Sequence, residues 1–464
     1  MQFVGREPEL KALRTWPKTS KLTAIYGRRR IGKSRLVAEA ADGSRFLKFE
    51  GLEAQSSANQ RRHFRDTLAR YSKLQTHSSL SAVSWEDLLI SLSEYLGKTP
   101  TILLFDEFQW MASERGELVS TLKFVWDNYF SQKNRIHLIL CGSVSSFIVK
   151  KVIQSKALFG RIDLQINLGP LSLGEVRRGI FPSWSRDEVL KIYLALGGVP
   201  KYLELCDTGK SFEQNILDLF FSPLSPLISE LDSLFVSHFG KNKDYSKVIA
   251  YMAGRKYASR KDISAHLDQD SGGGVSTILA DLEMAGFIAE CRYIKGFKRT
   301  KSIHYRICDP FLRFFFKFVH SRVRKIKALR APMNVLEALP TQSFHVWQGF
   351  AFEGVCHGHA DSIARALGFG AVDYEYGSVA SGKLQPELDL VYSRKDGVMT
   401  ICEIKSGKSV DLSVIKQVRD QIESLQGATK KTINAALIAT GKVDSRVQES
   451  RLFIAILGLD AMLS

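Results

Sequence analysis

The chain has 464 residues, with 65 Lys and Arg against 48 Asp and Glu, which gives a formal net charge of +17. Apolar residues make up 45% and charged residues 24% of the sequence, a composition that excludes a disordered tail, a fibrous repeat and a small disulfide scaffold. At about 150 residues per domain, the length predicts roughly three domains.

Nothing in the sequence is typical of a membrane or secreted protein. No apolar run approaches the ~20 residues that cross a bilayer, and the N-terminus lacks the basic and apolar regions of a signal peptide. The cysteines are scattered without a C-x-x-C pair, as is typical of reduced thiols. We therefore expect a cytoplasmic protein without membrane contact.

The first 235 residues alternate apolar runs with segments of helical spacing. The pattern predicts strands over 22–26, 101–105 and 136–140 and a helix over 33–41. Strands that alternate with helices indicate an α/β fold with a parallel sheet covered on both faces.

The loop between the first strand and the helix matches the phosphate-binding pattern G-x-x-x-x-G-K-[ST]. It consists of Gly27, Arg28, Arg29, Arg30, Ile31, Gly32, Lys33 and Ser34, with Arg35 next. Such glycines let backbone N–H groups and the helix N-terminus point at phosphates. Lys33 would bridge the β- and γ-phosphates, and the Ser34 hydroxyl would ligate Mg²⁺. The alternative is a chance match in a glycine-containing loop.

Two adjacent acids end the strand 101–105. Asp106 would hold Mg²⁺ and Glu107 would polarise the attacking water, so the pair favours nucleotide hydrolysis over simple binding. After the next strand, Ser143 could sense the γ-phosphate, or it could be a turn or helix cap. Arg161 is a candidate arginine finger acting on a neighbouring subunit, with a surface ion pair to Asp163 as the alternative.

Several of these segments together resemble the archaeal-type ATPase family of the AAA+/STAND division. The resemblance lies in residues 3–10, 26–36, 105–109, 142–143, 159–161 and 195–202. It implies ATP as the nucleotide. It also implies a P-loop ATPase core over 1–170 and a helical subdomain over 171–238 that packs near the nucleotide through its Gly-Gly-x-Pro segment.

Most of the excess charge lies in residues 241–330, where 20 Lys and Arg face 8 Asp and Glu. The segment order predicts a winged helix-turn-helix domain over 239–330. Its expected elements are helices over 245–252, 259–267 and 275–285 and strands over 287–294 and 303–307. The charge favours DNA as a partner. A solvated face that only aids solubility, or an interdomain adapter, are the alternatives.

The positive charge lies outside the expected recognition helix, which carries Asp281 and Glu283. It lies on the expected wing, in the second helix and over 322–330, which favours phosphate contacts and weak sequence specificity. The wing and second-helix cations are Arg292, Lys295, Lys298, Arg299, Lys301, Arg260 and Lys261. The aromatic run 311–318 predicts a buried helix, with Arg313 and Lys317 as its solvent-facing stripe, rather than a base-stacking surface.

The last region combines acids with a lysine on two expected strands, 387–392 and 399–404, joined by a turn at 393–397. Alternation along a strand puts Glu387 with Asp389, and Glu403 with Lys405, on one side each. Acids on neighbouring strands can share divalent metals, and a lysine can position or deprotonate a water. This geometry suits phosphodiester hydrolysis, whereas a surface ion-pair hairpin is the alternative.

These residues resemble the PD-(D/E)XK nuclease superfamily, through the segments 386–389 and 403–405. The resemblance implies a nuclease-like domain over 340–464. It implies Mg²⁺ or Mn²⁺ on Asp389, Glu403 and the helix acid Glu353, with Lys405 as a catalytic residue and Gln417 at a matching polar position. Two residues separate Pro386 from Asp389, which leaves the first part of the motif loose. A fold without turnover is a further alternative.

The sequence as a whole predicts an ATPase coupled to DNA binding and metal-dependent DNA cleavage, in a homo-oligomer where Arg161 acts in trans. An ATP-gated DNA-binding switch or scaffold without cleavage is the alternative. A small-molecule kinase is a third and weaker interpretation, because the phosphate loop stands beside a basic module with no evident substrate lid.

Overall fold

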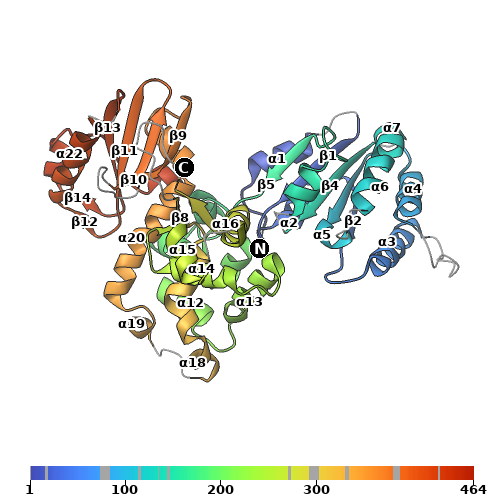
Figure 1. The fold of residues 1–464 in the computed structure, drawn as a ribbon, viewed down its shortest axis with the longest axis horizontal. Helices are drawn as coiled ribbons and strands as arrows, with labels where there is room; N and C mark the ends of the chain where they lie inside the picture. The colour runs from blue at the N-terminus through green and yellow to red at the C-terminus, as the bar shows by residue number, and fades with distance from the viewer. Residues whose placement is uncertain are drawn as a thin grey trace. The chain divides into compact units, whose positions relative to one another are not determined.

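The structure is a computed structural model. It describes residues 2–15, 19–73, 84–112, 117–133, 135–143, 147–269, 273–291, 303–329, 334–379, 387–426 and 429–463. The chain divides into two compact units (Figure 1). The N-terminal unit comprises Met1–Pro170 with Val199–Lys201, and the C-terminal unit comprises Leu171–Gly198 with Tyr202–Ser464.

The N-terminal unit is built on a parallel sheet of order β2-β3-β4-β1-β5. Its strands are β1 (Lys21–Tyr26), β2 (Arg45–Glu50), β3 (Thr101–Asp106), β4 (Ile136–Gly142) and β5 (Leu164–Asn167). Every residue of β3 and β4 is buried, as expected for central strands covered on both faces. The three predicted strands are therefore confirmed.

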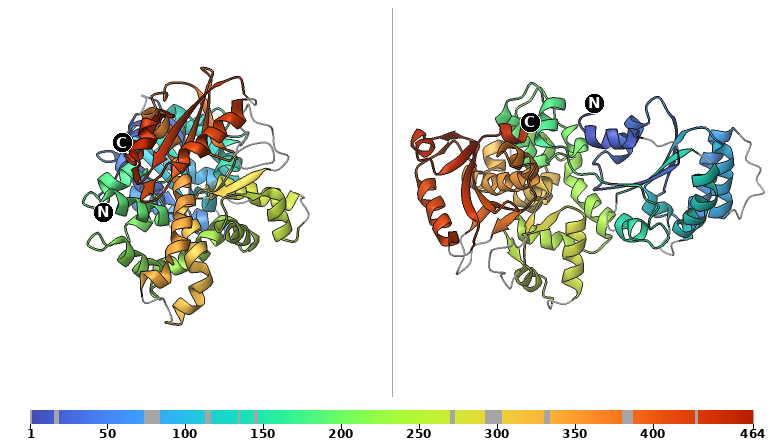
Figure 2. Two further views of the ribbon diagram at one scale, coloured as in Figure 1. Left: turned by 90° about the vertical axis from the view of Figure 1, so that its left-hand side faces the viewer. Right: turned by 90° about the horizontal axis from the view of Figure 1, so that it is seen from above.

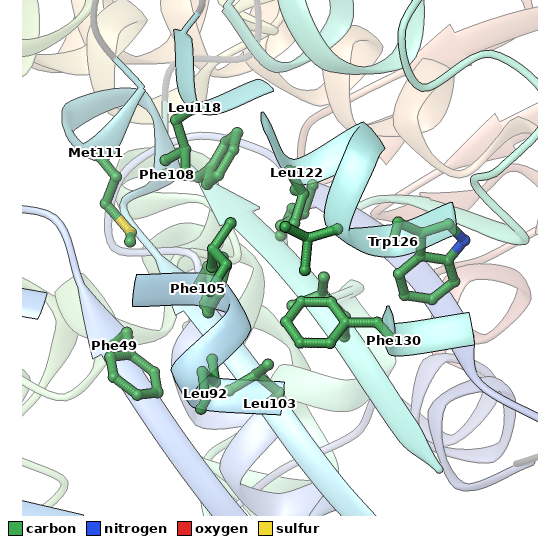
Figure 3. Close-up of a cluster of buried hydrophobic side chains, with 14 of the residues drawn as sticks. Phe49, Leu92, Leu103, Phe105, Phe108, Met111, Leu118, Leu122, Trp126 and Phe130 are labelled. Carbon is green, nitrogen blue, oxygen red and sulfur yellow. The ribbon is translucent and has the colours of Figure 1, made fainter. Parts of the chain in front are cut away.

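Helices cover the faces of this sheet. They are α1 (Glu7–Arg14), α2 (Lys33–Ala40), α3 (Ser57–Ser72), α4 (Trp85–Leu96), α5 (Phe108–Met111), α6 (Glu117–Val125) and α7 (Ser131–Lys133), with π-helical turns at Trp126–Phe130 and Ile148–Ile153. Aromatic and leucine side chains from β3, α4, α5 and α6 form one buried cluster against the sheet (Figure 3). This core fixes the carboxyl end of β3, where the two predicted acids lie.

The C-terminal unit begins with helices. They are α9 (Leu173–Gly179), α10 (Arg186–Leu196), α12 (Phe212–Phe220) and α13 (Pro226–Phe239). The short α11 (Pro200–Leu203) begins in the N-terminal unit and ends in the C-terminal one. Capping boxes begin α9 and α12, at Ser172 with Glu175 and at Ser211 with Gln214. A helical segment thus follows the parallel sheet along the chain.

The first part of the basic region, over the described residues of 244–307, contains three helices and a small antiparallel sheet of order β6-β8-β7. Its elements are α14 (Asp244–Ala253), β6 (Ala258–Ser259), α15 (Arg260–His266), α16 (Gly273–Met284), β7 (Ile288–Glu290) and β8 (His304–Ile307). Ser259 caps α15 in a capping box with Asp262. The predicted wing cations, from Arg292 to Lys301, lie outside the described residues.

The aromatic run forms α17 (Pro310–Phe314) and a π-helical turn at Phe315–Val319, and its phenylalanines are buried as predicted. The prediction for Arg313 is wrong, because this side chain is buried. Its guanidinium donates to the carbonyl oxygens of Ile307, at 2.9 Å, and Arg255, at 3.4 Å. A buried cation thus ties the helix to β8, whereas Lys317 is exposed.

A second five-stranded sheet, of order β15-β13-β11-β10-β9, forms the end of the C-terminal unit (Figure 2). Its strands are β9 (Tyr374–Val379), β10 (Leu388–Arg394), β11 (Val398–Lys405), β13 (Thr432–Ala439) and β15 (Phe453–Leu457). A small pair is β12 (Ser409–Val410) with β14 (Lys442–Val443). The predicted hairpin is confirmed, since β10 and β11 pair antiparallel with Leu390 opposite Cys402.

The remaining helices of this unit are α18 (Val323–Lys327), α19 (Val335–Ala338), α20 (Thr341–Gly358), α21 (Ala360–Ala366), α22 (Ser413–Gln426), α23 (Ser445–Glu449) and α24 (Asp460–Leu463). Of these, α20, α21 and α22 pack on the sheet. On β10, Val391 packs with the core under α22, while the next side chain, Tyr392, donates its hydroxyl proton to the Ala360 carbonyl of α21. Among the described helices, none is long and apolar enough to cross a membrane. The six cysteines form no disulfide in the described chain.

Candidate functional site

The predicted phosphate loop joins β1 to α2. At Gly27 the backbone has φ +150°, and a Cβ here would lie 2.4 Å from the carbonyl oxygen of Leu168. The same leucine donates its N–H to the Tyr26 carbonyl at 2.7 Å. Only glycine fits this close approach. Gly32, with φ +94°, begins α2, so the N-terminus of that helix opens onto the loop.

Lys33 is buried inside this loop. Its ammonium donates to the carbonyl oxygens of Gly27 and Arg28, both at 3.0 Å. These two carbonyl oxygens are the partners of the Lys33 ammonium in the absence of a ligand, and the phosphate oxygens of a bound nucleotide would take their place. The side chain of Ile31 is buried, so only its backbone is available to a ligand, while Arg35 is exposed on α2.

Ser34 and Asp106 meet, as the motif pair requires. The serine hydroxyl donates to Asp106 Oδ2 at 2.7 Å. The same oxygen lies 2.9 Å from the ammonium of Lys48, which also contacts Glu50 at 3.0 Å. Burial lowers the pKa of Lys48, but the hydrogen bonds and charges of Asp106 and Glu50 outweigh it, so the pKa is raised. Lys48 lies on β2, outside every motif, and the sequence analysis missed it.

Glu107 follows β3 in a left-handed backbone conformation, with φ 49°. Its Oε2 accepts the hydroxyl proton of Ser143 at 2.7 Å and also contacts the amide nitrogen of Gln109. That amide nitrogen donates to the Ser143 oxygen at 3.1 Å. The predicted catalytic acid and the predicted phosphate sensor therefore belong to one hydrogen-bonded group. Gln109 completes it, and the sequence analysis had given it no role.

The structure corrects the alternative interpretation of Arg161, a surface ion pair with Asp163. Its guanidinium pairs with Asp127, 34 residues away, through Nε at 2.7 Å and Nη2 at 2.8 Å. Asp163 instead accepts the backbone N–H of Leu22 at 2.8 Å. The bidentate pair lowers the pKa of Asp127 through the Arg161 hydrogen bond and charge. Lys123 contacts the same carboxylate at 3.4 Å.

A second group of acids lies on β10 and α20 of the C-terminal unit. Asp389 Oδ1 lies 2.8 Å from the ammonium of Lys256, while its Oδ2 accepts the backbone N–H of Ile404 at 3.0 Å. The same ammonium lies 2.8 Å from Glu353 and 2.6 Å from Glu387. Glu387 and Asp389 thus share one side, as predicted, although Glu387 precedes β10 rather than lying on it.

Glu403 and Lys405 also lie on one side of β11, with the ammonium 2.7 Å from Glu403 Oε1. Two glutamines of α22 bind the same carboxylate: Gln417 donates to Oε1 at 2.7 Å and Gln421 to Oε2 at 3.1 Å. Lys405 further donates to Gln417 at 3.0 Å. Gln417, which the resemblance placed at a matching polar position, thus contacts Glu403, and Gln421, to which the sequence gave no role, contacts the same carboxylate.

Burial and the neighbouring charge of Asp389 raise the pKa of Glu353 to about 7, against the opposing pull of Lys256. The same two causes raise the pKa of Glu403. Among the residues that the structure describes, no three His, Cys, Asp or Glu side chains are arranged to hold a metal ion. Of the expected ligands, Glu353 and Asp389 contact Lys256, and Glu403 contacts Lys405.

The parallel sheet, the phosphate loop and the paired Ser34 and Asp106 define the N-terminal unit as an α/β P-loop ATPase domain. In agreement, residues 3–206 match the family model of an ATPase domain predominantly from Archaea. An uncharacterized protein of Methanocaldococcus jannaschii is 25% identical over 358 residues, which is 76% of each chain.

Two solved structures are among those to which the chain is similar. The Walker-type ATPase of Pyrococcus abyssi has a TM-score of 0.47 at 19% identity, over 68% of this chain and 96% of its own. The ORC2 protein of Aeropyrum pernix has a TM-score of 0.43 at 14% identity, over 71% of this chain and 95% of its own.

Proposed function

We propose that the N-terminal unit binds ATP with Mg²⁺ and hydrolyses the ATP. The observation that carries this proposal is the 2.7 Å contact between the Ser34 hydroxyl and Asp106. A hydroxyl and a carboxylate oxygen are hard donors that suit Mg²⁺, and both already meet beside the loop. Once bound there, the metal would neutralise charge on the β- and γ-phosphates.

In the proposed reaction, the oxygen of a water attacks the γ-phosphorus. The bond from that phosphorus to the β–γ bridging oxygen breaks, and ADP and inorganic phosphate form. Glu107 accepts the water proton, and Ser143, 2.7 Å away, holds that carboxylate in place. Lys33 exchanges its two loop carbonyls for phosphate oxygens.

Two variants test this proposal separately for binding and for turnover. Lys33→Ala is expected to abolish binding of a fluorescent ATP analogue, whereas the exposed Lys98→Ala leaves it unchanged. Glu107→Gln is expected to keep binding and to lower phosphate release by about 100-fold or more, since it removes the proton acceptor. Undiminished ATP affinity in Lys33→Ala would refute the assignment of the loop.

We further propose that the basic region of the C-terminal unit binds DNA with weak sequence specificity. Arg324, Lys325 and Lys327 are exposed on α18, and Lys261 is exposed on α15. If six or more phosphates are contacted, affinity for duplex DNA falls about 10³-fold or more between 50 and 200 mM salt. Replacing the three α18 cations by alanine should flatten that slope. A wild-type affinity indifferent to salt would instead indicate a protein partner.

The finer proposal is that the bound DNA is cleaved at the acids of the second sheet. It assigns Asp389, Glu403 and Glu353 to a divalent metal, Mg²⁺ or Mn²⁺, and Lys405 to positioning the water that attacks phosphorus and breaks one P–O ester bond. A plasmid-nicking assay with either metal tests it. Nicking should disappear in Asp389→Ala and Lys405→Ala, and Lys33→Ala shows whether ATP controls it. No nicking with ATP hydrolysis intact would favour the non-cleaving switch.

Arg161 is proposed to act in trans in a homo-oligomer. To reach a neighbouring subunit it must first release both of its bonds to Asp127. Arg161→Ala is then expected to keep ATP binding and to lose hydrolysis only at concentrations where the wild-type protein self-associates. Equal loss in the dilute monomer would assign Arg161 to a structural role.

A further inference from the structure

Lys256 stands at the point where the acids of the second sheet converge. It lies in the turn between α14 and β6, 133 residues before Asp389 in the chain. Its ammonium nitrogen lies within 2.8 Å of one oxygen each from Glu353, Glu387 and Asp389. The ammonium of Lys256 therefore forms ion pairs with three carboxylates, which lie on a helix, in a loop and on a strand.

The charges at this point do not balance. Three carboxylates face one ammonium, whereas the neighbouring Glu403 forms its own pair with Lys405 at 2.7 Å. An ion pair that only joined two segments would need a single acid. Three carboxylate oxygens instead converge on one point, and carboxylate oxygens are the ligands that Mg²⁺ and Mn²⁺ prefer.

The position is also open on one side. The side chains of Lys256 and Asp389 are 18% and 11% exposed, but that of Glu387 is 43% exposed. A hydrated ion can therefore approach past Glu387. Lysine itself is an unbranched side chain with four rotatable bonds, and it can leave by rotation without moving the backbone.

We propose that Lys256 is a built-in cation lock: its ammonium occupies the point between Glu353, Glu387 and Asp389 where a divalent metal would bind, and it keeps the metal out until the lysine withdraws. The proposal rests on the proposed cleavage function for its purpose, but not for its test, because metal binding can be measured without DNA. The lock accounts for two findings together. The expected acids are present, yet among the described residues no three His, Cys, Asp or Glu side chains are arranged to hold a metal ion. DNA phosphates at the basic region would give the withdrawn ammonium other partners.

Three full-length variants test the lock, with Mn²⁺ as the probe and its binding followed by electron paramagnetic resonance. Lys256→Met removes the charge and keeps the apolar stem, Lys256→Arg keeps a cation in place, and Lys210→Met is the control. Lys210 belongs to the same unit and pairs at the surface with Asp218 at 2.8 Å, so its loss removes one equal charge elsewhere.

We expect Lys256→Met to bind one additional Mn²⁺ at least ten-fold more tightly than the wild type. The other two variants should bind as the wild type does. Mn²⁺ should also raise the melting temperature of Lys256→Met above its effect on Lys210→Met, because the ion restores a cation among three carboxylates that lost theirs. Adding Glu353→Gln to Lys256→Met should weaken the new site again.

Unchanged Mn²⁺ affinity in a folded Lys256→Met would overturn the lock. If that variant fails to fold, lysine acetylation of the wild-type protein decides the matter. Lys256 should be protected without metal and acetylated when Mn²⁺ is present, and protection under both conditions would again overturn the proposal. Tight Mn²⁺ binding without DNA nicking would support the lock and refute the cleavage function, so the two failures are distinguishable.

Discussion

Removing the ammonium of Lys48 should destabilise the nucleotide-free protein more than the nucleotide-bound one. Lys48→Met keeps the apolar stem of the side chain and deletes the charge that lies 2.9 Å from Asp106 and 3.0 Å from Glu50. The Asp106 side chain is 4% exposed, so it cannot exchange this partner for full hydration. Ser34 remains as its hydroxyl donor.

The size of the effect follows from this geometry. A hydrogen bond to a charged group contributes about 1.5–3 kcal/mol, and the 35% exposure of Lys48 calls for a discount for solvent screening. We expect the free energy of unfolding to fall by about 1–2 kcal/mol, which for a unit of this size lowers the melting temperature by about 2–8 °C. With Mg²⁺ and ADP, the deficit should shrink to about half or less, because Mg²⁺ near Asp106 replaces the missing charge.

Calorimetry of the full chain, with and without Mg²⁺ and ADP, measures both values. Lys98→Met, an exposed lysine of the same unit, is the matched control and should show no deficit in either condition. A deficit that stays the same when Mg²⁺ and ADP are added would refute the reasoning, because Lys48 and the metal would then not share Asp106.

Two further predictions concern residues outside the sites. Gly198→Ala should cost about 3 kcal/mol of unfolding free energy in urea titrations, since its Cβ would lie 1.9 Å from the Leu171 carbonyl oxygen, whereas Gly254→Ala, with open space around it, should be neutral. Burial and, secondarily, the charge of Lys21 lower the pKa of His137 to about 3. Because only the unfolded chain takes up this proton between pH 6.5 and 3, stability should fall on acidification by up to about 1.4 kcal/mol per pH unit. His137→Gln should remove this contribution to the pH dependence of stability. An unchanged slope in that variant would contradict the lowered pKa of His137 as its cause.

The sequence predicted those features that depend on short-range patterns. The phosphate loop follows from fixed spacing between a strand and a helix, and the β10–β11 hairpin follows from alternation on either side of an Asp-Gly turn. The same alternation correctly placed Glu403 beside Lys405. Each of these features is determined within about 15 residues of chain, where backbone geometry alone decides which side chains meet.

Partners that come from distant segments could not be predicted in this way. Proximity in sequence suggested Asp163 as the ion-pair partner of Arg161, but in the structure Arg161 pairs with Asp127. Arg313 was placed in solvent by helical spacing, although two backbone carbonyls satisfy it in the core. The spacing of residues along a helix shows which side chains lie on the same face of that helix, but it does not show whether another segment of the fold covers that face.

Lys48 and Lys256 show a shared physical requirement that no motif records. A carboxylate that must receive a metal is also buried when the metal is away, and a buried charge needs a partner of opposite sign. Each lysine supplies it, so a metal at either of the two proposed sites would have to displace a resident cation. Lys48 is 35% exposed and Asp106 has Ser34 as a second donor, whereas Lys256 is 18% exposed and bound to three acids. Under the two proposals, displacement should be easier at Asp106, and the proposed N-terminal site should bind Mg²⁺ at lower concentration than the proposed C-terminal one.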